Sequence, residues 1–345
     1  MTGLVSCLSS VISSDSAISL RGEHIAKLAP FLVAGDLAIR LQATKLVELI
    51  IDRVAYDNDY SLTVVVSNVS ANLIREAMTD ILEASLELFE KLLTLPQTFS
   101  YITNSDVPYG IFELTLHNDK KIIQKALTLL HQMLIGTAPS AKIVVGFVNR
   151  FKRLTSDPSL QAASLSILQT LLSSPLIYKE IASNNGTIDA FKQCFSSPDS
   201  HVIAKSLKLC FGFLSNPISF PQFSVLTSSL AQQLCIEIPD VAALSAACLT
   251  AIANRNGPLE IIKDSTGKKT AAFLNSALIL NDTQNSDNAQ NSEISQNSEN
   301  IRKLTIPALR LSGVISGSFS GAIFLEKCNV LHKIKELLGL IKRRN

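Results

Sequence analysis

The sequence has no tryptophan, and aromatic residues make up only 6% of its 345 residues. Its longest apolar runs fall well short of the roughly 18 residues needed to span a bilayer, so no transmembrane helix is expected. The amino terminus, MTGLVSCLSSVISS, lacks the basic segment of a secretory signal. A formal net charge of +2 gives no strong field toward nucleic acid. These absences favour a core of small aliphatic side chains, because 47% of the residues are hydrophobic.

Recognisable catalytic and ligand-binding motifs are also missing. The chain has no GxxxxGK[ST] phosphate loop, GxGxxG dinucleotide motif, HExxH zinc motif or GxSxG nucleophile motif. The 5 histidines and 6 cysteines follow neither metal-ligand nor disulfide spacing. We therefore predict that the protein is not an enzyme, that it has no cofactor or metal site, and that it lies in the reducing cytoplasm.

A unit of about 40 residues repeats along the chain. Each unit opens with an aspartate, followed seven positions later by a small residue and eight positions later, in the clearest units, by an apolar one. The clear origins are Asp119, Asp157, Asp199 and Asp240, and weaker origins are Asp36 and Asp80. An aspartate at a helix start accepts backbone N–H bonds, and a small residue lets two helices cross closely. We therefore predict an all-α fold of stacked helices.

The stretch NNGTIDAFKQCFSSPDSHVIAKSLKLCFGFL at 184–214 resembles the armadillo repeat family. The residues that carry this resemblance are Gly186, Ile188, Phe191, Cys194, Phe195, Pro198, Asp199, Val202, Ser206 and Leu207. The similarity covers about residues 36–316 and is strongest at 107–256. It implies a right-handed superhelical solenoid of about six or seven units, forming one domain over residues 1–345. The HEAT repeat is the near alternative.

Two segments stand outside the regular pattern. Residues 281–300 repeat Gln-Asn-Ser and contain almost nothing that can be buried, so we expect a disordered insert that displaces the next origin to residue 301. Residues 331–345 are predicted to form an amphipathic helix that caps the stack. A nuclear import signal, a membrane-surface helix and a docking helix are the alternatives for that helix.

The resemblance also allows a test for peptide clamping. Armadillo proteins that hold extended peptides carry a repeated asparagine thirteen positions after the origin, and importin-alpha adds a tryptophan at the ninth. Here the thirteenth position holds Leu49, Leu93, Gln132, Thr170, Gly212 and Ala253. The ninth holds Lys45, Phe89, Thr128, Ser166, Lys208 and Leu249. Without a repeated amide, regular hydrogen bonding to an extended backbone is lost, so a nuclear import receptor is not expected.

A mild polar strip remains on the same helices. It consists of Lys125, Thr128, Gln132, Ser166, Thr170, Lys205 and Lys208. We predict that these residues contact a protein partner with an acidic or helical surface; the alternative is a plain solvated surface.

The function expected from these features is a non-catalytic scaffold or adaptor that binds proteins, without nucleic-acid binding or integral membrane association. One alternative is a regulatory armadillo-like region or fragment that works with a Fused-type or Unc-51-like protein kinase. A membrane-traffic tether acting through residues 331–344 is the remaining alternative.

Overall fold

The computed structural model describes residues 20–51, 54–55, 60–75, 78–234, 237–278 and 291–344. The regular secondary structure of this part of the chain is helical apart from one two-residue parallel pairing, in which Leu20 and Arg21 of β1 face Val54 and Ala55 of β2. The all-α prediction is therefore confirmed.

Contacts divide the chain into two compact units, whereas the sequence predicts one domain. Unit 1 is Met1–Val144 with Ser166–Ser174, and unit 2 is Val145–Leu165 with Pro175–Asn345. Helices α9 (Ala141–Thr155) and α10 (Pro158–Leu171) each contribute residues to both units. We describe each unit by itself.

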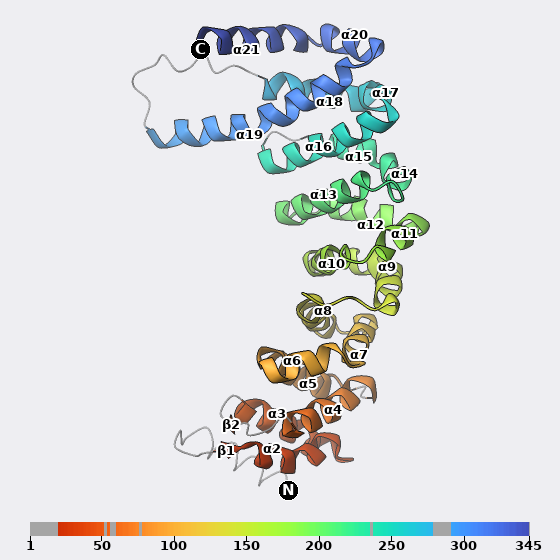
Figure 1. Ribbon diagram of the computed structural model, residues 1–345, viewed down its shortest axis with the longest axis vertical. Helices are drawn as coiled ribbons and strands as arrows, with labels where there is room; N and C mark the ends of the chain where they lie inside the picture. Colours follow the sequence, from red (N-terminus) through yellow and green to blue (C-terminus); the bar gives the residue numbers. More distant parts are fainter. Residues whose placement is uncertain are drawn as a thin grey trace. The chain divides into compact units, whose positions relative to one another are not determined.

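Unit 1 is built from short helices in sequence order (Figure 1). Its elements are β1 (Leu20–Arg21), α2 (Gly22–Leu28), η1 (Ala29–Val33), α3 (Leu37–Ile50), β2 (Val54–Ala55), α4 (Tyr60–Arg75), α5 (Thr79–Thr94), α6 (Pro96–Thr103), α7 (Val107–Glu113), η3 (Leu114–Leu116) and α8 (Lys120–Leu134). Helix α5 packs against both α3 and α8, so these helices form one row.

Unit 2 has the same construction with longer helices near its end (Figure 1). Its elements are α11 (Leu176–Ser183), α12 (Gly186–Phe195), α13 (Ser200–Ser215), α14 (Phe220–Phe223), η4 (Ser224–Leu226), α15 (Thr227–Gln232), α16 (Pro239–Asn256), α17 (Leu259–Ile262), α18 (Asp264–Ala277), α19 (Asn291–Ser316), α20 (Phe319–Lys327) and α21 (Val330–Arg344). Helices α13, α16 and α19 lie side by side.

The helices that begin at the repeat origins, here called frame helices, are α3, α5, α8, α10, α13 and α16. Asp36, Asp119 and Asp199 cap three of them with side-chain oxygens that accept backbone N–H bonds, as predicted. Asp157 accepts from the N–H of Ser159 at 3.1 Å, just before α10. These four aspartates mark true helix starts.

The other two origins need a correction of two residues. The N-cap of α5 is Met78 and that of α16 is Ile238, so Asp80 and Asp240 lie inside the first turn. Counted from the true caps, the seventh positions are Ser85 and Ser245, and both are fully buried. The predicted small residue Ala247 is instead half-buried. With this correction the frame helices begin 38 to 42 residues apart.

The core of unit 2 is richer in aromatic rings than its sequence average suggests. Phe151, Phe191, Phe213 and Phe223 are fully buried, and their ring centroids lie between 4.8 and 6.0 Å apart in successive pairs. The three pairs are tilted, edge-to-face and stacked in turn, and aromatic pairs of these kinds add about 0.5–1.5 kcal/mol each beyond the area they bury. This cluster holds α9, α12, α13 and α14 together.

Helix α19 begins within the predicted insert. Residues 291–300 are helical in backbone, while residues 281–290 lie outside the described residues. The helical half contains neither glycine nor proline, so a helix that forms at 301–316 can extend backward into it. Counted from an origin at residue 301, Leu304, Ala308, Leu311 and Ile315 are buried like the corresponding residues of α13.

The carboxy-terminal helix α21, which spans the segment predicted to cap the stack, packs against α18 and α20. Its Lys333 donates from Nζ to the carbonyl of Asn275 at 2.7 Å, and Val330 is fully buried. Leu338 and the residues after it have no described side chains, so the rest of the predicted apolar stripe lies outside the description.

Candidate protein-binding surface

The seven predicted partner-binding residues lie on three frame helices. Lys125, Thr128 and Gln132 belong to α8, Ser166 and Thr170 to α10, and Lys205 and Lys208 to α13. The first five are in unit 1 and the two last lysines are in unit 2. The structure therefore places the predicted strip on two surfaces, which have different chemistry.

Lys125 is held by carboxylates of the preceding frame helix. Its Nζ lies 3.2 Å from Glu83 Oε1 and 2.5 Å from Glu87 Oε1, both on α5. Partial burial lowers the pKa of Lys125, but the hydrogen bonds and charges of Glu87 and Glu83 outweigh it and raise that pKa above its ordinary value. An acidic partner would have to compete with two carboxylates for this cation.

The hydroxyls of the strip are directed to their own helices. Thr128 Oγ1 donates to the carbonyl of Gln124 at 3.0 Å, and Thr170 Oγ1 donates to that of Ser166 at 3.1 Å. Each hydroxyl keeps only acceptor capacity for a ligand. The half-buried Gln132 is the strip residue of unit 1 with a side-chain amide.

A hollow of about 340 Å³ lies between α5 and α8. It is lined by Glu83, Leu86, Glu90, Lys121, Gln124, Lys125, Thr128 and Leu129. Glu83, Glu87 and Glu90 were missed from the sequence because counting from Asp80 puts the buried Phe89 at the ninth position. Their spacing of four and three residues, opposite the apolar stripe of α5, is the signal that identifies an exposed acidic face.

In unit 2, α13 presents cations beside an exposed aromatic ring. Burial lowers the pKa of Lys205, which is half-buried, whereas Lys208 is exposed. Phe211 is one helical turn beyond Lys208 and is 42% exposed. Phe211 thus places exposed apolar area beside the Lys208 cation.

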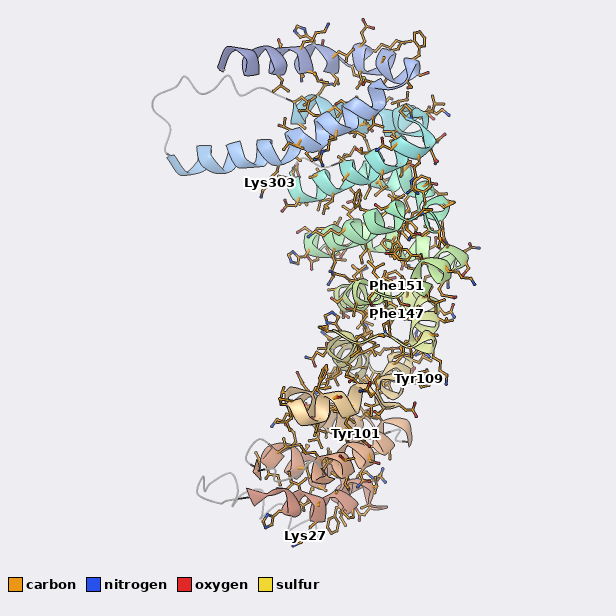
Figure 2. All side chains as sticks on the ribbon, viewed as in Figure 1. Lys27, Tyr101, Tyr109, Phe147, Phe151 and Lys303 are labelled. Atoms are coloured by element: carbon orange, nitrogen blue, oxygen red, sulfur yellow. The ribbon has the colours of Figure 1, made fainter. Side chains whose placement is uncertain are left out.

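The neighbouring helices α16 and α19 extend this surface. Helix α16 contributes the small, half-buried Ala247 and Ala251. On α19, Ile306 is 59% exposed and Arg310 is exposed. Lys303, labelled on α19 in Figure 2, lies 4.0 Å from Asp240. Among the side chains that the structure describes, neither Lys208 nor Arg310 has a carboxylate partner.

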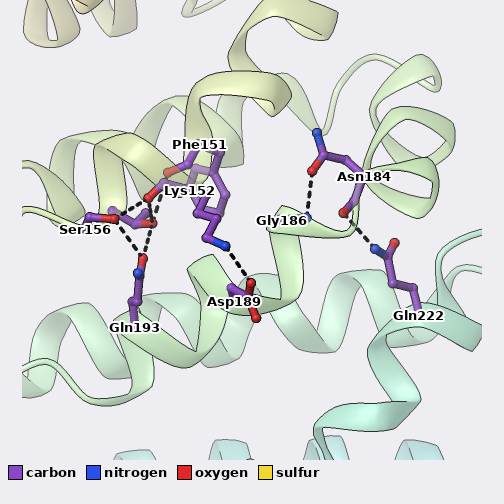
Figure 3. A network of polar contacts seen from close by, with 9 residues as sticks. Phe151, Lys152, Ser156, Asn184, Gly186, Asp189, Gln193 and Gln222 are labelled. Carbon is purple, nitrogen blue, oxygen red and sulfur yellow. Dashed lines mark hydrogen bonds and ion pairs between the residues drawn. The ribbon is translucent and has the colours of Figure 1, made fainter.

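A polar network on α9, α12, α14 and the C-cap residue of α11 is a second cluster of unit 2 (Figure 3). Lys152 Nζ lies 2.7 Å from Asp189 Oδ2, and the amide of Gln222 donates to the carbonyl of Asn184 at 2.8 Å. Lys152 holds the pKa of Asp189 below its ordinary value by hydrogen bonding and charge. Because these groups satisfy one another across adjoining helices, we interpret the network as a structural connection between repeats.

Three cysteines of unit 2, Cys194, Cys210 and Cys248, are buried core residues. Burial raises the pKa of the Cys194 thiol to about 12. Burial also raises the pKa of Cys210 well above its ordinary value, and the adjacent Cys248 thiol raises it further. Thiolate is the reactive form, so these buried groups are poor nucleophiles.

The corrected origins do not restore a peptide-clamping ladder. Counted from Met78 and Ile238, the thirteenth positions are Lys91 and Ala251, and the ninth are Glu87 and Ala247. No frame helix from α3 to α16 therefore carries the repeated asparagine or tryptophan. Within the described ranges no group of three metal-ligating side chains occurs, and no helix there is long and apolar enough to cross a membrane.

Comparison with known proteins gives information on the fold alone. No family model matches the sequence, and no curated protein matches it. An engineered protein, Northeast Structural Genomics Consortium target OR497, resembles the structure with a TM-score of 0.57 at 17% identity, over 84% of this chain and 67% of that one. A second engineered protein, target OR366, gives 0.50 at 14% identity, over 67% of this chain and 98% of that one. The chain thus has a helical repeat-like, all-helical fold, and the armadillo resemblance stays a prediction.

Proposed function

We propose that this protein is a non-catalytic scaffold or adaptor of the cytoplasm, built as an armadillo-type superhelical solenoid that binds other proteins through its frame helices. The observation that carries the proposal is the unit 2 surface of α13, α16 and α19. Lys208 and Arg310 lie on its outer two helices without carboxylate partners among the described side chains, beside the exposed Phe211 and Ile306.

This surface suits an acidic, amphipathic partner. Apolar side chains such as Phe211 and Ile306 supply desolvated contact area, and the flanking cations steer an acidic ligand and set its orientation. The unit 1 surface is less suitable because Lys125 already holds two carboxylates. We therefore place the main binding surface on unit 2. Of the seven residues of the predicted strip, this proposal keeps Lys205 and Lys208, and it adds Phe211, Ile306 and Arg310.

The test is direct titration of a purified partner. Affinity purification with mass spectrometry supplies candidate partners, and each is then purified and titrated. The double variant Lys208→Glu, Arg310→Glu should weaken binding by about tenfold or more, with a reduced dependence on salt. The matched control is Lys268→Glu, Lys269→Glu, which makes the same charge change on the exposed part of α18 and should stay within about twofold.

Equal affinities for the parent protein and both double variants would contradict the assignment of the surface. Recovery of a protein kinase whose activity changes when the purified protein is added would instead support the regulatory alternative. If deletion of residues 331–344 abolished binding of a partner and the two double variants did not, the membrane-traffic tether would be supported instead.

A further inference from the structure

A second candidate surface lies at the turn between α6 and α7, in unit 1. Two hollows, of about 170 and 360 Å³, adjoin there and share Ser105 and Asp106. The smaller is bounded by α4 and Tyr101 of α6, and the larger by Tyr109 of α7 and the turn that follows α8. We call the two adjoining hollows the furrow, and Ser105 with Asp106, which line both, its ridge. Tyr101 lines the smaller hollow and Tyr109 the larger, and both tyrosines are labelled in Figure 2.

Both tyrosines offer ring surface at low entropic cost. Tyr101 is 43% exposed and Tyr109 is 40% exposed. The Tyr109 ring is held in place, because its centroid lies 6.2 Å from that of Phe112 and 5.6 Å from Nζ of Lys142. Tyrosine has few side-chain torsions, so an ordered ring of this kind is a favourable contact for a ligand.

The ridge between the hollows is fixed before any ligand binds. Ser105 Oγ donates to the carbonyl of Ile102 at 2.7 Å and accepts from the N–H of Val107 at 3.2 Å. Pro108 then sets the backbone at the start of α7. A preformed furrow loses little conformational freedom when it is occupied.

The negative charge of Asp106 on the ridge favours a ligand that carries a positive charge. Asp106 is exposed, and its carboxylate has no partner among the described side chains. Lys142, which lines the larger hollow, lies over the Tyr109 ring, so its positive charge is already in contact with that ring. A ligand that crosses the ridge therefore meets an open carboxylate between two tyrosine rings.

We propose that this furrow binds an extended, proline-containing peptide of a partner protein that carries arginine or lysine beside its prolines. Such a peptide adopts the polyproline II conformation, which has no internal hydrogen bonds and leaves its carbonyls free to accept. Proline rings pack against the tyrosine rings, the Tyr101 hydroxyl donates to a peptide carbonyl, and the Asp106 carboxylate pairs with the basic residue. A continuous helix fits less well, because the Ser105–Asp106 ridge divides the furrow.

This inference does not depend on the function proposed for unit 2, since every residue involved belongs to unit 1. The probes are three fluorescein-labelled peptides, titrated by fluorescence anisotropy against the full chain. One is proline-rich with a single arginine, the second replaces the arginine by glutamate, and the third replaces the prolines by alanine. We expect the arginine peptide to bind with a Kd of roughly 10–100 μM, and the other two at least about fivefold more weakly.

Variants then assign the roles. Tyr101→Ala should weaken the arginine peptide by about fivefold or more, and Tyr101→Phe should retain part of the affinity by keeping the ring. Asp106→Asn should remove the preference for arginine over glutamate. Asp80→Asn, an exposed carboxylate in the first turn of α5 that lines neither hollow, is the matched control and should change nothing.

Three results would overturn the inference: no saturable binding up to about 1 mM, equal binding of the alanine peptide, or binding insensitive to both Tyr101→Ala and Asp106→Asn. Thermal unfolding of each variant, followed by circular dichroism, separates lost binding from lost structure. The Tyr101→Phe and Asp106→Asn variants keep the test decisive if Tyr101→Ala unfolds.

Discussion

The two units join neighbouring frame helices in different ways. In unit 1, ion pairs cross the surface: Lys91 Nζ lies 3.3 Å from Glu48 on α3, and Lys125 pairs with Glu83 and Glu87 on α5. In unit 2, α13 and α16 meet through buried small groups, and the Cys248 thiol donates to the carbonyl of Leu207 at 3.5 Å. A lysine that is paired with a carboxylate of the next helix is less available to a partner protein. Helices that instead pack through small buried groups leave their surface lysines available.

The largest expected effect concerns the close crossing in unit 2. Ala246 is fully buried at the eighth position of α16, so Ala246→Leu should lower the free energy of unfolding by about 1–3 kcal/mol through overpacking. Its neighbour Ala247 is half-buried, and Ala247→Leu should cost less than about 0.5 kcal/mol. Urea unfolding of both variants measures the difference. A larger loss of unfolding free energy in Ala247→Leu than in Ala246→Leu would show that the repeat is better counted from Asp240.

A smaller effect compares two buried serines at the same position of the frame. Ser245 donates to the carbonyl of Leu230, so Ser245→Ala should cost about 1 kcal/mol in the free energy of unfolding. Ser85 is buried, and its hydroxyl has no hydrogen-bond partner among the residues that the structure describes. Ser85→Ala should therefore be neutral or slightly stabilising, because it removes an unsatisfied group. Similar losses in both variants would show that Ser85 also needs its hydroxyl.

The smallest effect concerns the surface ion pairs of unit 1. Lys125→Met should cost at most about 1 kcal/mol at neutral pH, and less in high salt. The folded pKa of Lys125 is raised, so its contribution is complete below the unfolded pKa of about 10.4 and is lost as pH rises through the folded value. The difference in urea midpoint between parent and variant should therefore shrink above about pH 10.

Lys208→Met is the control for that experiment. Lys208 is exposed and has no carboxylate partner among the described side chains, so its removal should leave the urea midpoint nearly unchanged at either pH. A pH-dependent loss of the same size in Lys208→Met would mean that the two units do not differ in how they use surface charge.

The helical periods and the cap residues could be predicted from the sequence, because Asp36, Asp119 and Asp199 form side-chain caps at helix starts. The starts of α5 and α16 could not be predicted to the residue. A carboxylate stabilises a helix both at the cap and within the first turn, so Asp80 and Asp240 are compatible with either position. The burial of Ser85 and Ser245 resolves that ambiguity.

The candidate surface was only partly predictable for the same reason. Lys208 followed from a correctly placed origin at Asp199, while Glu87 was missed through the displaced origin at Asp80. Phe211 and Ile306 carry no sequence signal of exposure, because apolar side chains on a helix usually face a core. Their exposure depends on where the neighbouring helices lie, and only the tertiary structure gives those positions.

The burial of Cys210 and Cys248 at the crossing of α13 and α16 makes these two thiols internal probes of local unfolding. A thiol-alkylating reagent can react with them only when this part of the repeat stack transiently separates, so the labelling rate reports the free energy of that local opening. Cys328 on the partly open surface near α20 gives the reference rate in the same molecule. A partner that binds across α13 and α16 should slow the first reaction and leave the second unchanged.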